Sequence, residues 1–451
     1  MKDTKTLIFL ILISTISSQP PGQSDKNNYD YSSYSAISTN ENLSSATKQS
    51  TVSDQSVVYI TNSGITIDKS TLQKTGGESS NIENSEFYGV NAAVLVQGGS
   101  VTITDGTIST AAKGGNAVCA TNSGKVTISG TKLTSTGPSS ARGLHSTYGG
   151  SIIANNVEIS STGGSCATLA TDRGEGTVSC TGCTLKTGGA GSPLIYSTGT
   201  ITVSGTSGTA TGAQMVVIEG KNTATVKDNS NLKCYGIANR NDVDKCGVML
   251  YQSMSGDAAT GTSTFNCANS KLEILQESSV YSSAPMFFIT NTNAVINLES
   301  CTFTYGSNIF LSAKGTSEWG KSGSNGGSVT LSLNNQVISG NFEVDGNSEL
   351  TIKLVNSQIT GTINTAKTAS KLAIILDSSS KITLTGNSYY TSIENADSTG
   401  KNIVKNNYSF SDYEGNSDDN NKTNDDEATK FIGSTYLNVP ILLMFIILFW
   451  Y

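Results

Sequence analysis

The sequence carries one pattern four times in succession, as AVCATNSGKVTIS (residues 117–129), GLHSTYGGSIIA (143–154), TLATDRGEGTVS (168–179) and LIYSTGTITVS (194–204). Each copy contains a shared threonine, and these threonines are spaced by 26, 24 and 27 residues. Polar and apolar residues alternate within each copy, which indicates short β-strands, and no helical periodicity is present. A period near 25 residues made of short strands predicts a β-solenoid, in which each repeat forms one coil.

The composition agrees with a solenoid of stacked strands. Only 36% of the residues are hydrophobic, whereas Gly, Ser, Thr and Asn are abundant. A solenoid needs only a narrow apolar column along each sheet for its core, because the backbone polar groups of each coil hydrogen-bond to the coils above and below. The residues expected to face inward are Val118, Ala120, Leu144, Ile195, Val217, Met249, Phe287 and Ile289. The strict hexapeptide period of a left-handed form is absent, so we expect an all-β fold, a right-handed parallel β-helix (β-solenoid) of about a dozen coils over residues 57–405.

Both ends of the chain carry address signals. Residues 1–18 combine early lysines, an apolar run and then small residues, which predicts a secretory signal peptide. A flexible leader is expected over residues 19–56, where apolar periodicity is lacking. An acidic, Asn-rich stalk (406–436) precedes a hydrophobic tail (437–451) that is shorter than a membrane-spanning helix. This tail resembles a GPI-attachment signal, with a short membrane anchor as the alternative, and predicts a location at the extracellular face of the plasma membrane.

The formal net charge is −7, and most of it lies in the acidic stalk. The body of the chain is therefore close to neutral and has no basic stripe. A nucleic-acid partner has little electrostatic support in such a chain. Three N-glycosylation sequons, at Asn42, Asn407 and Asn421, lie outside the predicted solenoid or at its margin.

The charged stretch ATDRGEG (170–176) follows the shared threonine, where the other copies read TNSG, TYGG and STGT. This position is one corner of the solenoid, so stacking brings its polar side chains to one lateral face. Amides and carboxylates beside aromatic rings are suited to binding a sugar chain. The candidate ligand-binding residues are Asn122, Tyr148, Asp172, Arg173, Glu175, Glu219, Gln252, Asn291 and Trp319, with Lys221 and Asn293 at the same corner. The alternative is a solvated corner with an Asp172–Arg173 or Arg173–Glu175 ion pair, and with Trp319 folded over an apolar edge.

Several phrases in this region resemble those of a known group of proteins. They include LATDRGEGTV, IYSTGTITV, VIEG, GVMLYQSMSGDA, FFITNTNAVI and WGKSGSNGGSV. The chain resembles right-handed parallel β-helix surface proteins of the adhesin-like type, within the pectin-lyase-like superfamily, over roughly residues 85–400. The resemblance implies the fold and carries no established catalytic residues. Because the superfamily includes polysaccharide lyases and hydrolases, it also implies an enzyme of that class as an alternative function.

A catalytic or metal site has weaker support in the residues themselves. Glycoside hydrolysis needs two carboxyl groups about 5 to 9.5 Å apart, whereas Asp172 and Glu219 are expected about two coils apart, near 10 Å. NRNDVD (239–244) offers oxygen ligands for calcium, but a turn explains it as well. The CTGC segment (180–183) has metal-ligand spacing without a second such pair, so zinc has weak support. We expect the single histidine, His145, to be a packed residue, and we predict no cofactor.

Eight cysteines in a secreted chain suggest disulfide bonds. Cys234 and Cys246 bracket a loop expected to protrude, so we predict a bridge between them. Cys267 and Cys301 end comparable strands in successive coils, and stacking favours their pairing. The connectivity of the other cysteines stays open.

Three functions are compatible with this reading. The leading hypothesis is a GPI-anchored cell-surface adhesion or carbohydrate-recognition protein, whose partner is a polysaccharide, a cell-surface glycan or a surface protein of a host or neighbouring cell. The second is a polysaccharide lyase or hydrolase of pectin-lyase-like architecture. The third is a structural surface-coat protein without a specific ligand. Release of new sugar ends would identify the enzyme, and saturable binding without product would identify the recognition protein.

Overall fold

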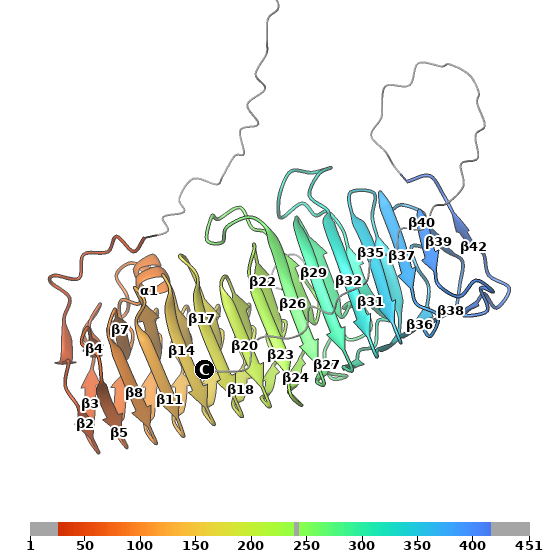
Figure 1. Cartoon of the computed structure of the whole chain (residues 1–451). Helices are drawn as coiled ribbons and strands as arrows, with labels where there is room; N and C mark the ends of the chain where they lie inside the picture. Colours follow the sequence, from red (N-terminus) through yellow and green to blue (C-terminus); the bar gives the residue numbers. More distant parts are fainter. Residues whose placement is uncertain (1–25, 239–242, 416–451) are drawn as a thin grey trace, which may run out of the picture. The chain divides into compact units, whose positions relative to one another are not determined.

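The computed structural model of the protein describes residues 26–238 and 243–415. These residues form a stack of parallel β-coils (Figure 1), in which each regular coil contributes one strand to each of three sheets. We call these sheets A, B and C, in the order in which the chain visits them. The described residues include one α-helix, α1 (Ile82–Tyr88), which begins after the N-cap residue Asn81 and ends at Gly89 in the left-handed conformation.

The strands follow one another in the same order in every sheet. Sheet A contains β1 (Ala36–Thr39), β4 (Ser56–Ile60), β7 (Val94–Gln97), β10 (Val118–Thr121), β13 (Leu144–Ser146), β16 (Leu169–Thr171), β19 (Ile195–Ser197), β22 (Val216–Glu219), β25 (Val248–Tyr251), β28 (Phe287–Thr290), β31 (Ile309–Ala313) and β34 (Asn341–Val344). Sheet B contains β2 (Leu43–Ser44), β5 (Ile65–Asp68), β8 (Ser100–Thr104), β11 (Lys125–Ser129), β14 (Gly150–Asn155), β17 (Gly176–Thr181), β20 (Thr200–Ser204), β23 (Thr223–Lys227), β26 (Thr262–Ala268), β29 (Thr292–Glu299), β32 (Gly327–Asn334), β35 (Glu349–Val355), β37 (Lys371–Leu376) and β40 (Ser392–Asn395).

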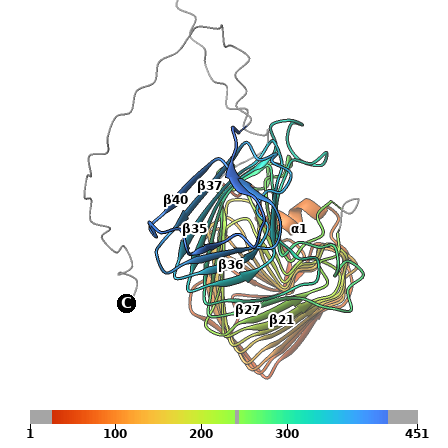
Figure 2. The same ribbon diagram turned by 90° about the vertical axis from the view of Figure 1, so that its right-hand side faces the viewer.

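Sheet C is shorter and gives way to a separate sheet in the last coils. It contains β3 (Thr47–Ser50), β6 (Thr71–Lys74), β9 (Thr107–Thr110), β12 (Lys132–Ser135), β15 (Glu158–Ser161), β18 (Thr184–Thr187), β21 (Ser207–Ala210), β24 (Asn231–Cys234), β27 (Lys271–Ile274) and β30 (Thr302–Thr304). Sheet D contains β33 (Val337–Ser339), β36 (Gln358–Gly361), β38 (Lys381–Leu384) and β41 (Ile403–Val404), and a last pair joins β39 (Ser388–Tyr390) to β42 (Phe410–Asp412). Viewed end-on, β36 does not continue the line of β27 and β21 (Figure 2).

One apolar core runs through the interior of the stack. Most strands of sheet B alternate between buried and more exposed residues, as in β26, because one face meets the core and the other faces outward. The predicted inward residues Val118, Ala120, Leu144, Ile195, Phe287 and Ile289 all belong to this core. The prediction is wrong for Val217 and Met249, which lie in a separate cluster with Trp319 on the outer side of sheet A.

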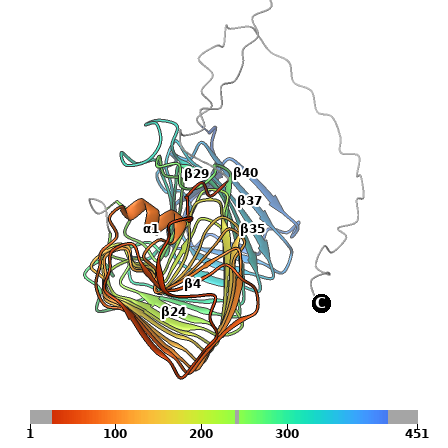
Figure 3. The same cartoon turned by 90° about the vertical axis from the view of Figure 1, so that its left-hand side faces the viewer.

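Sheet A differs from sheet B because its outer face is covered as well. Every residue of β10 and β28 is buried, which alternation alone does not produce. The N-terminal residues Tyr31 and Tyr34 pack over Leu95 on this outer face, in the first coils. Further along, α1 lies on the outside of the coils (Figure 3). The two-sided burial explains why apolar residues of sheet A do not all belong to the central core.

The solenoid begins earlier and ends later than the sequence predicted. Strands β1, β2 and β3 form the first coil within the segment expected to be a flexible leader, and Asn42 lies there with its Oδ1 accepting a hydrogen bond from the Thr66 N–H (2.8 Å). These strands contain few apolar residues, so the sequence pattern did not identify them. Strand β3, for example, reads TKQS, and Ser50 is its one buried residue. At the other end, β42 lies within the expected stalk, and Asn407 is exposed. Asn421 and most of the stalk and tail lie outside the described residues.

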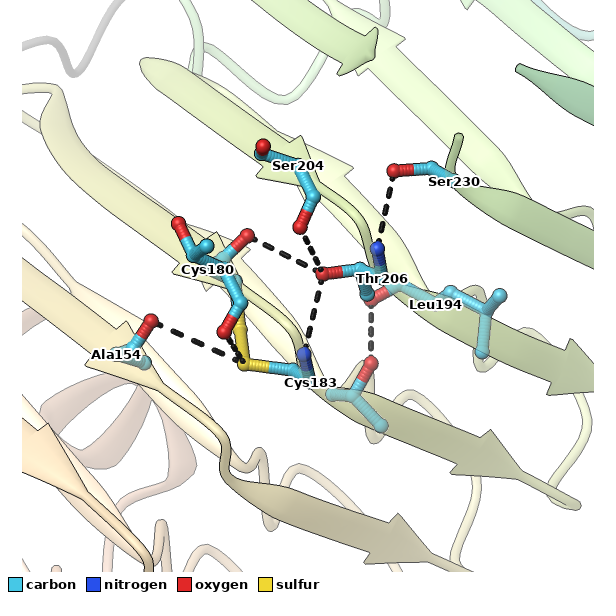
Figure 4. Close-up of a disulfide and its surroundings, with 9 residues drawn as sticks. Ala154, Cys180, Cys183, Leu194, Ser204, Thr206 and Ser230 are labelled. Carbon is cyan, nitrogen blue, oxygen red and sulfur yellow. Dashed lines mark hydrogen bonds between the residues drawn. A yellow bond between two sulfur atoms is a disulfide. The ribbon is translucent and has the colours of Figure 1, made fainter. Parts of the chain in front are cut away.

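The turn between sheets B and C is held by a ladder of hydroxyl groups. Thr206 accepts a hydrogen bond from the Cys183 N–H of the preceding coil (3.3 Å), and its own N–H donates to Ser230 Oγ of the following coil (3.1 Å), as Figure 4 shows. At these two turns the side-chain oxygen satisfies a backbone N–H that no strand pairs. The residue just before the ladder position adopts a left-handed backbone in coil after coil, at Asp105, Asn156, Asn269, Asn335 and Asn356. Asn and Asp tolerate this conformation better than other non-glycine residues.

Two disulfides are present among the described cysteines. Cys267 bonds to Cys301 and links two successive coils, which confirms that predicted pair. Cys180 bonds to Cys183 across one turn (Figure 4). The sequence had offered only weak support for zinc at this pair and had left its disulfide connectivity open. The predicted bridge between Cys234 and Cys246 is wrong, because both are buried thiols without a disulfide. Cys234 ends β24 with its side chain in the central core, whereas Cys246 belongs to the outer cluster that contains Trp319.

Two long connections leave sheet A and return to sheet B. They span residues 252–261, between β25 and β26, and residues 314–326, between β31 and β32, and both protrude beyond the coils in Figure 1. We call them the first and the second corner loop. No helix within residues 26–238 and 243–415 is long and apolar enough to cross a membrane.

Candidate functional site

Asp172, the first charge of ATDRGEG, lies in a buried ion cluster. Its Oδ2 is 3.0 Å from Nη1 of Arg142, and both side chains are at least nine-tenths buried. Nη2 of Arg142 lies 3.5 Å from Oε1 of Glu86 in α1, and Nη1 donates to Nε2 of His145 (3.1 Å). Burial raises the pKa of Asp172 to about 8, with Arg142 acting in the opposite direction. Asp172 therefore helps fix α1 to the coils and does not face an open corner.

His145 is buried, as predicted, but on the outer side of sheet A beneath α1. It pairs with Cys119 and Ala170 in the adjacent strands. Because arginine has no acceptor, its bond to Arg142 makes Nε2 the unprotonated nitrogen. Burial, reinforced by the charge of Arg142, lowers the pKa of His145 well below its usual value, so the imidazole is neutral.

Arg173 and Glu175 form ion pairs other than those that the sequence suggested. Nη2 and Nε of Arg173 each lie 2.9 Å from Oδ1 of Asp257 in the first corner loop. The same guanidinium lies 3.6 Å from the ring centroid of Phe87 in α1. Glu175 pairs with Lys221 at 2.8 Å, and both side chains are about half exposed. Arg173 thus connects α1 to the first corner loop, and these charges hold the covering segments in place.

The predicted residues Tyr148 and Asn122 lie outside the open part of the corner. Tyr148 is buried and stacks on Tyr88 of α1, with ring centroids 5.8 Å apart and planes inclined by 7°. Asn122 is half-buried and occupies a left-handed turn position with φ of 51°. The ring face that a sugar would need is therefore already in contact with α1.

Glu219 is a second buried carboxylate, held by hydroxyl groups. Tyr196 and Tyr251 each donate to Oε2 at 2.7 Å, and the Ser253 hydroxyl donates to Oε1. Burial raises the pKa of Glu219, although these hydrogen bonds act in the opposite direction. Since Ser253 also belongs to the first corner loop, Glu219 anchors the start of that loop.

Trp319 anchors the second corner loop in the same way. Its side chain is 5% exposed and packs in the outer cluster with Met249 and Phe288. It also meets the ring of Tyr251 edge to face, with centroids 5.2 Å apart. This is the arrangement that the sequence analysis gave as the alternative, in which the tryptophan covers an apolar surface and is not presented to a sugar.

An open groove lies at the corner where both loops leave the coils. Its volume is about 630 Å³, and it contains the predicted residues Gln252, Asn291 and Asn293. Nδ2 of Asn291 donates to the backbone carbonyl of Gln252 at 2.8 Å, which joins two successive coils. The Oε1 atom of Gln252 is buried without a hydrogen-bond partner among the described residues. We call this site the corner groove.

The corner groove includes residues that the sequence analysis did not select. They are Ser253, Met254, Thr260, Gly261, Thr292, Gly320, Lys321, Ser324, Gly326, Gly327, Ser328, Asn347, Glu349 and Ser370. Strand pairing explains part of this set, because Asn293, Ser328 and Glu349 occupy the same register position in β29, β32 and β35. The signal in the sequence that could have identified these residues is the greater length of the repeats that contain the two corner loops. The short pattern shared by the repeats does not include these loops.

Gly320 sets the shape of the second corner loop beside the groove. Its φ is +73°, and a Cβ there would lie 2.2 Å from Oδ1 of Asn291. A residue with a side chain would be strained in this conformation and would push Asn291 out of position. The loop therefore depends on a glycine at the point where it meets the groove.

The chemistry of the corner groove is that of neutral polar groups. Its lining has one carboxylate, from Glu349, and one ammonium, from Lys321, and is otherwise mostly Asn, Gln, Ser, Thr and Gly. Throughout the described parts of the chain, no group of three or more His, Cys, Asp or Glu side chains is arranged to hold a metal ion. Most of the segment considered for calcium, residues 239–242, lies outside the described residues. The groove offers hydrogen-bond donors and acceptors to an uncharged ligand.

Comparisons with known proteins support the architecture. A family model described as a right-handed β-helix region matches residues 73–232. Together with the all-parallel stacked sheets, this match confirms the predicted right-handed parallel β-helix, an architecture of the pectin-lyase-like kind. No curated protein and no solved structure matches the chain.

Proposed function

We propose that the protein is a cell-surface carbohydrate-recognition protein that binds a neutral glycan in the corner groove. The observation that carries the proposal is the groove's row of amide and hydroxyl side chains along successive coils. Asn291, Asn347 and Ser370 belong to three different coils, and successive coils stack at about 4.8 Å. A linear glycan offers hydroxyl groups at regular intervals, so a row of this kind suits a chain that runs along the stack.

The single carboxylate of the groove supports recognition over hydrolysis. Acid–base glycosidases use two carboxyl groups on opposite sides of the bond that is cleaved. Glu349 is the one carboxylate in the groove lining. The buried carboxylates Asp172 and Glu219 are hydrogen-bonded within the protein and do not line the groove.

A glycan array with the soluble chain (residues 19–415) tests this proposal. We expect binding to a neutral polysaccharide, and at least a tenfold loss of affinity in N291A/N293A, because each lost hydrogen bond to a sugar costs about 1 kcal/mol. N122A is the matched control, since Asn122 lies at the same corner outside the groove and should leave affinity unchanged. A blank array, or equal loss in both variants, would contradict the proposal, and new sugar ends in a digest would favour an enzyme.

The cell-surface location is part of the same proposal and rests on the sequence. Its support is the predicted signal peptide and the short hydrophobic tail after an acidic stalk. If the tail is exchanged for a GPI anchor, a phosphatidylinositol-specific phospholipase should release the protein from intact cells. Complete resistance to the phospholipase, with release only by detergent, would support the short membrane anchor instead.

A further inference from the structure

Sheet C stops within the stack, although sheets A and B continue. Strand β30 is its last member, and the next coil's strand at this position, β33, begins sheet D without pairing to β30. In the same two coils β28 pairs with β31 and β29 pairs with β32, so the coils touch on two sides and separate on the third. The separation leaves two strand edges that face each other.

A crevice of about 410 Å³ lies between these two edges. One wall is formed by residues 300–305 around β30, and the other by residues 335–339 around β33. The aromatic residues Phe303, Tyr305 and Phe310 line it, as does Val337, which is 67% exposed. None of its lining residues is charged, and none belongs to the corner groove. We call this site the β30–β33 crevice.

Backbone groups of both strands point into the crevice. The Thr302 N–H donates to the Ser270 carbonyl on the β27 side. Because alternate residues of a parallel strand bond to opposite neighbours, the N–H and C=O of Phe303 point toward β33. On the other wall, the Gly340 N–H donates to the Thr360 carbonyl, so the backbone groups of Ser339 point toward β30. Such edges readily accept a further strand.

One side chain already bonds to this edge as a peptide group would. Oε1 of Gln336 accepts from the Cys301 N–H at 2.8 Å, and its Nε2 donates to the Cys301 carbonyl at 2.6 Å. A second side chain crosses the crevice in the other direction. The hydroxyl of Tyr305, on the β30 wall, donates to the carbonyl of Ser339 on the β33 wall at 2.6 Å. The backbone of Cys301, directly before β30, thus already bonds to an amide on the side where the missing strand would lie.

We propose that the β30–β33 crevice binds an extended, uncharged peptide segment of a partner protein, which adds to the open edge of β30. Backbone hydrogen bonds to Phe303 supply affinity, and apolar side chains of the peptide pack on Tyr305 and Val337. The contact covers about three residues, or ~10 Å at a rise of ~3.3 Å per residue. The crevice gives the protein a protein-binding site that is separate from the corner groove and does not depend on glycan binding.

The test measures binding of a panel of capped, fluorescein-labelled heptapeptides to the soluble chain by fluorescence anisotropy. Each peptide alternates threonine with Val, Ile, Phe or Tyr, and a second set carries N-methyl groups on alternate backbone amides. We expect saturable binding of at least one parent peptide and at least tenfold weaker binding of its N-methylated form. Hydrogen exchange of the Phe303 amide should slow when the peptide is bound.

V337R and V355R are matched variants, because both valines are exposed and only Val337 lines the crevice. We expect V337R to weaken the peptide at least tenfold and V355R to leave it unchanged. The proposal is overturned if no peptide saturates by about 1 mM, if N-methylation has no effect, or if both variants behave alike. Displacement of the peptide by a neutral oligosaccharide would also overturn it, because the crevice would then be a sugar site.

Discussion

Asp172 and Glu219 are both buried carboxylates on the outer side of sheet A, but different groups stabilise them. Asp172 has a cation at 3.0 Å, from Arg142, whereas Glu219 is held by three hydroxyl donors. A buried ion pair loses stability steeply when one partner is removed, since the other charge stays behind. A buried carboxyl group that is held by hydroxyls, such as Glu219, has no neighbouring cation of this kind. Its contribution to stability therefore changes with pH as the group itself gains or loses a proton.

At pH 9, above the raised pKa of Asp172, replacing Asp172 with asparagine should destabilise the protein by about 3 kcal/mol, because Arg142 remains buried without its closest counter-charge. E175Q is the control, since the pair of Glu175 with Lys221 is about half exposed and is worth less than about 1 kcal/mol. Urea unfolding followed by circular dichroism measures both. Equal shifts in the two variants would mean that the buried cluster adds nothing beyond a surface pair.

Glu219 should make stability depend on pH. Its folded pKa lies above its unfolded value, so the folded state binds more protons, and stability falls as pH rises from the ordinary carboxyl range through the raised pKa. E219Q removes this titration, so its stability relative to the natural protein should increase with pH over that window. Unfolding midpoints of both proteins at matched pH values between 4 and 8 give the comparison, and a constant difference would contradict it.

The sequence identified ATDRGEG as a cluster of charges at one corner of the solenoid, but it did not predict the ion-pair partners of those charges. The sequence placed Asp172, Arg173 and Glu175 at one corner, and the structure connects them to Arg142, Asp257 and Lys221. Asp257 is 84 residues away from Arg173 in the chain. Such pairs depend on how an insertion folds back over several coils, which a local pattern does not contain.

At the scale of elements, each coil is fixed by its turns and by bonds to neighbouring coils. The hydroxyl ladder at the B–C turn and the Cys267–Cys301 bridge both cross from one coil to the next. The Cys180–Cys183 bridge closes a loop within one coil. The two disulfides therefore constrain the unfolded chain to different extents.

Removing Cys267–Cys301 should cost more stability than removing Cys180–Cys183. Their sequence separations are 34 and 3 residues, and the chain-entropy estimate gives about 3–4 kcal/mol for the longer loop and about 1.5 kcal/mol for the shorter one. Thermal unfolding of C267S/C301S and C180S/C183S tests the order. A larger loss for the short loop would indicate that local geometry at the turn outweighs the entropy of the unfolded chain.

At the scale of the whole described unit, the stack is continuous in two sheets and interrupted in the third. Sheets A and B pass the junction at β30, whereas sheet C ends there and sheet D begins. In repeat proteins, stability is roughly the sum of coil stabilities and contacts between neighbouring coils. The junction therefore lacks one of the three ladders that couple every other regular pair of coils up to this point.

Hydrogen exchange in increasing denaturant should show this weak junction. We expect amides in β33, β36 and β38 to lose protection at lower denaturant than amides in β12, β15 and β18, because fewer bonds couple the last coils to the rest. Mass spectrometry of peptides from each region measures the two transitions. Coincident loss of protection across the whole unit would show that sheets A and B alone make it cooperative.

The sequence by itself determined the fold, because a solenoid is encoded locally. Alternating strands and turn residues recur along the chain, and the period stays near 25 residues from β7 to β19, so each of these repeats carries the information for its own shape. The same logic gave the Cys267–Cys301 pair and most of the inward column. The tertiary structure alone decided which corner residues are covered and which remain open. Tyr148 and Trp319 contact segments that lie far from them in the chain. Asn291 lies in the groove because residues of the two corner loops form part of the groove's lining around it. Insertions break the period, and the surfaces they cover depend on long-range packing that no repeat specifies.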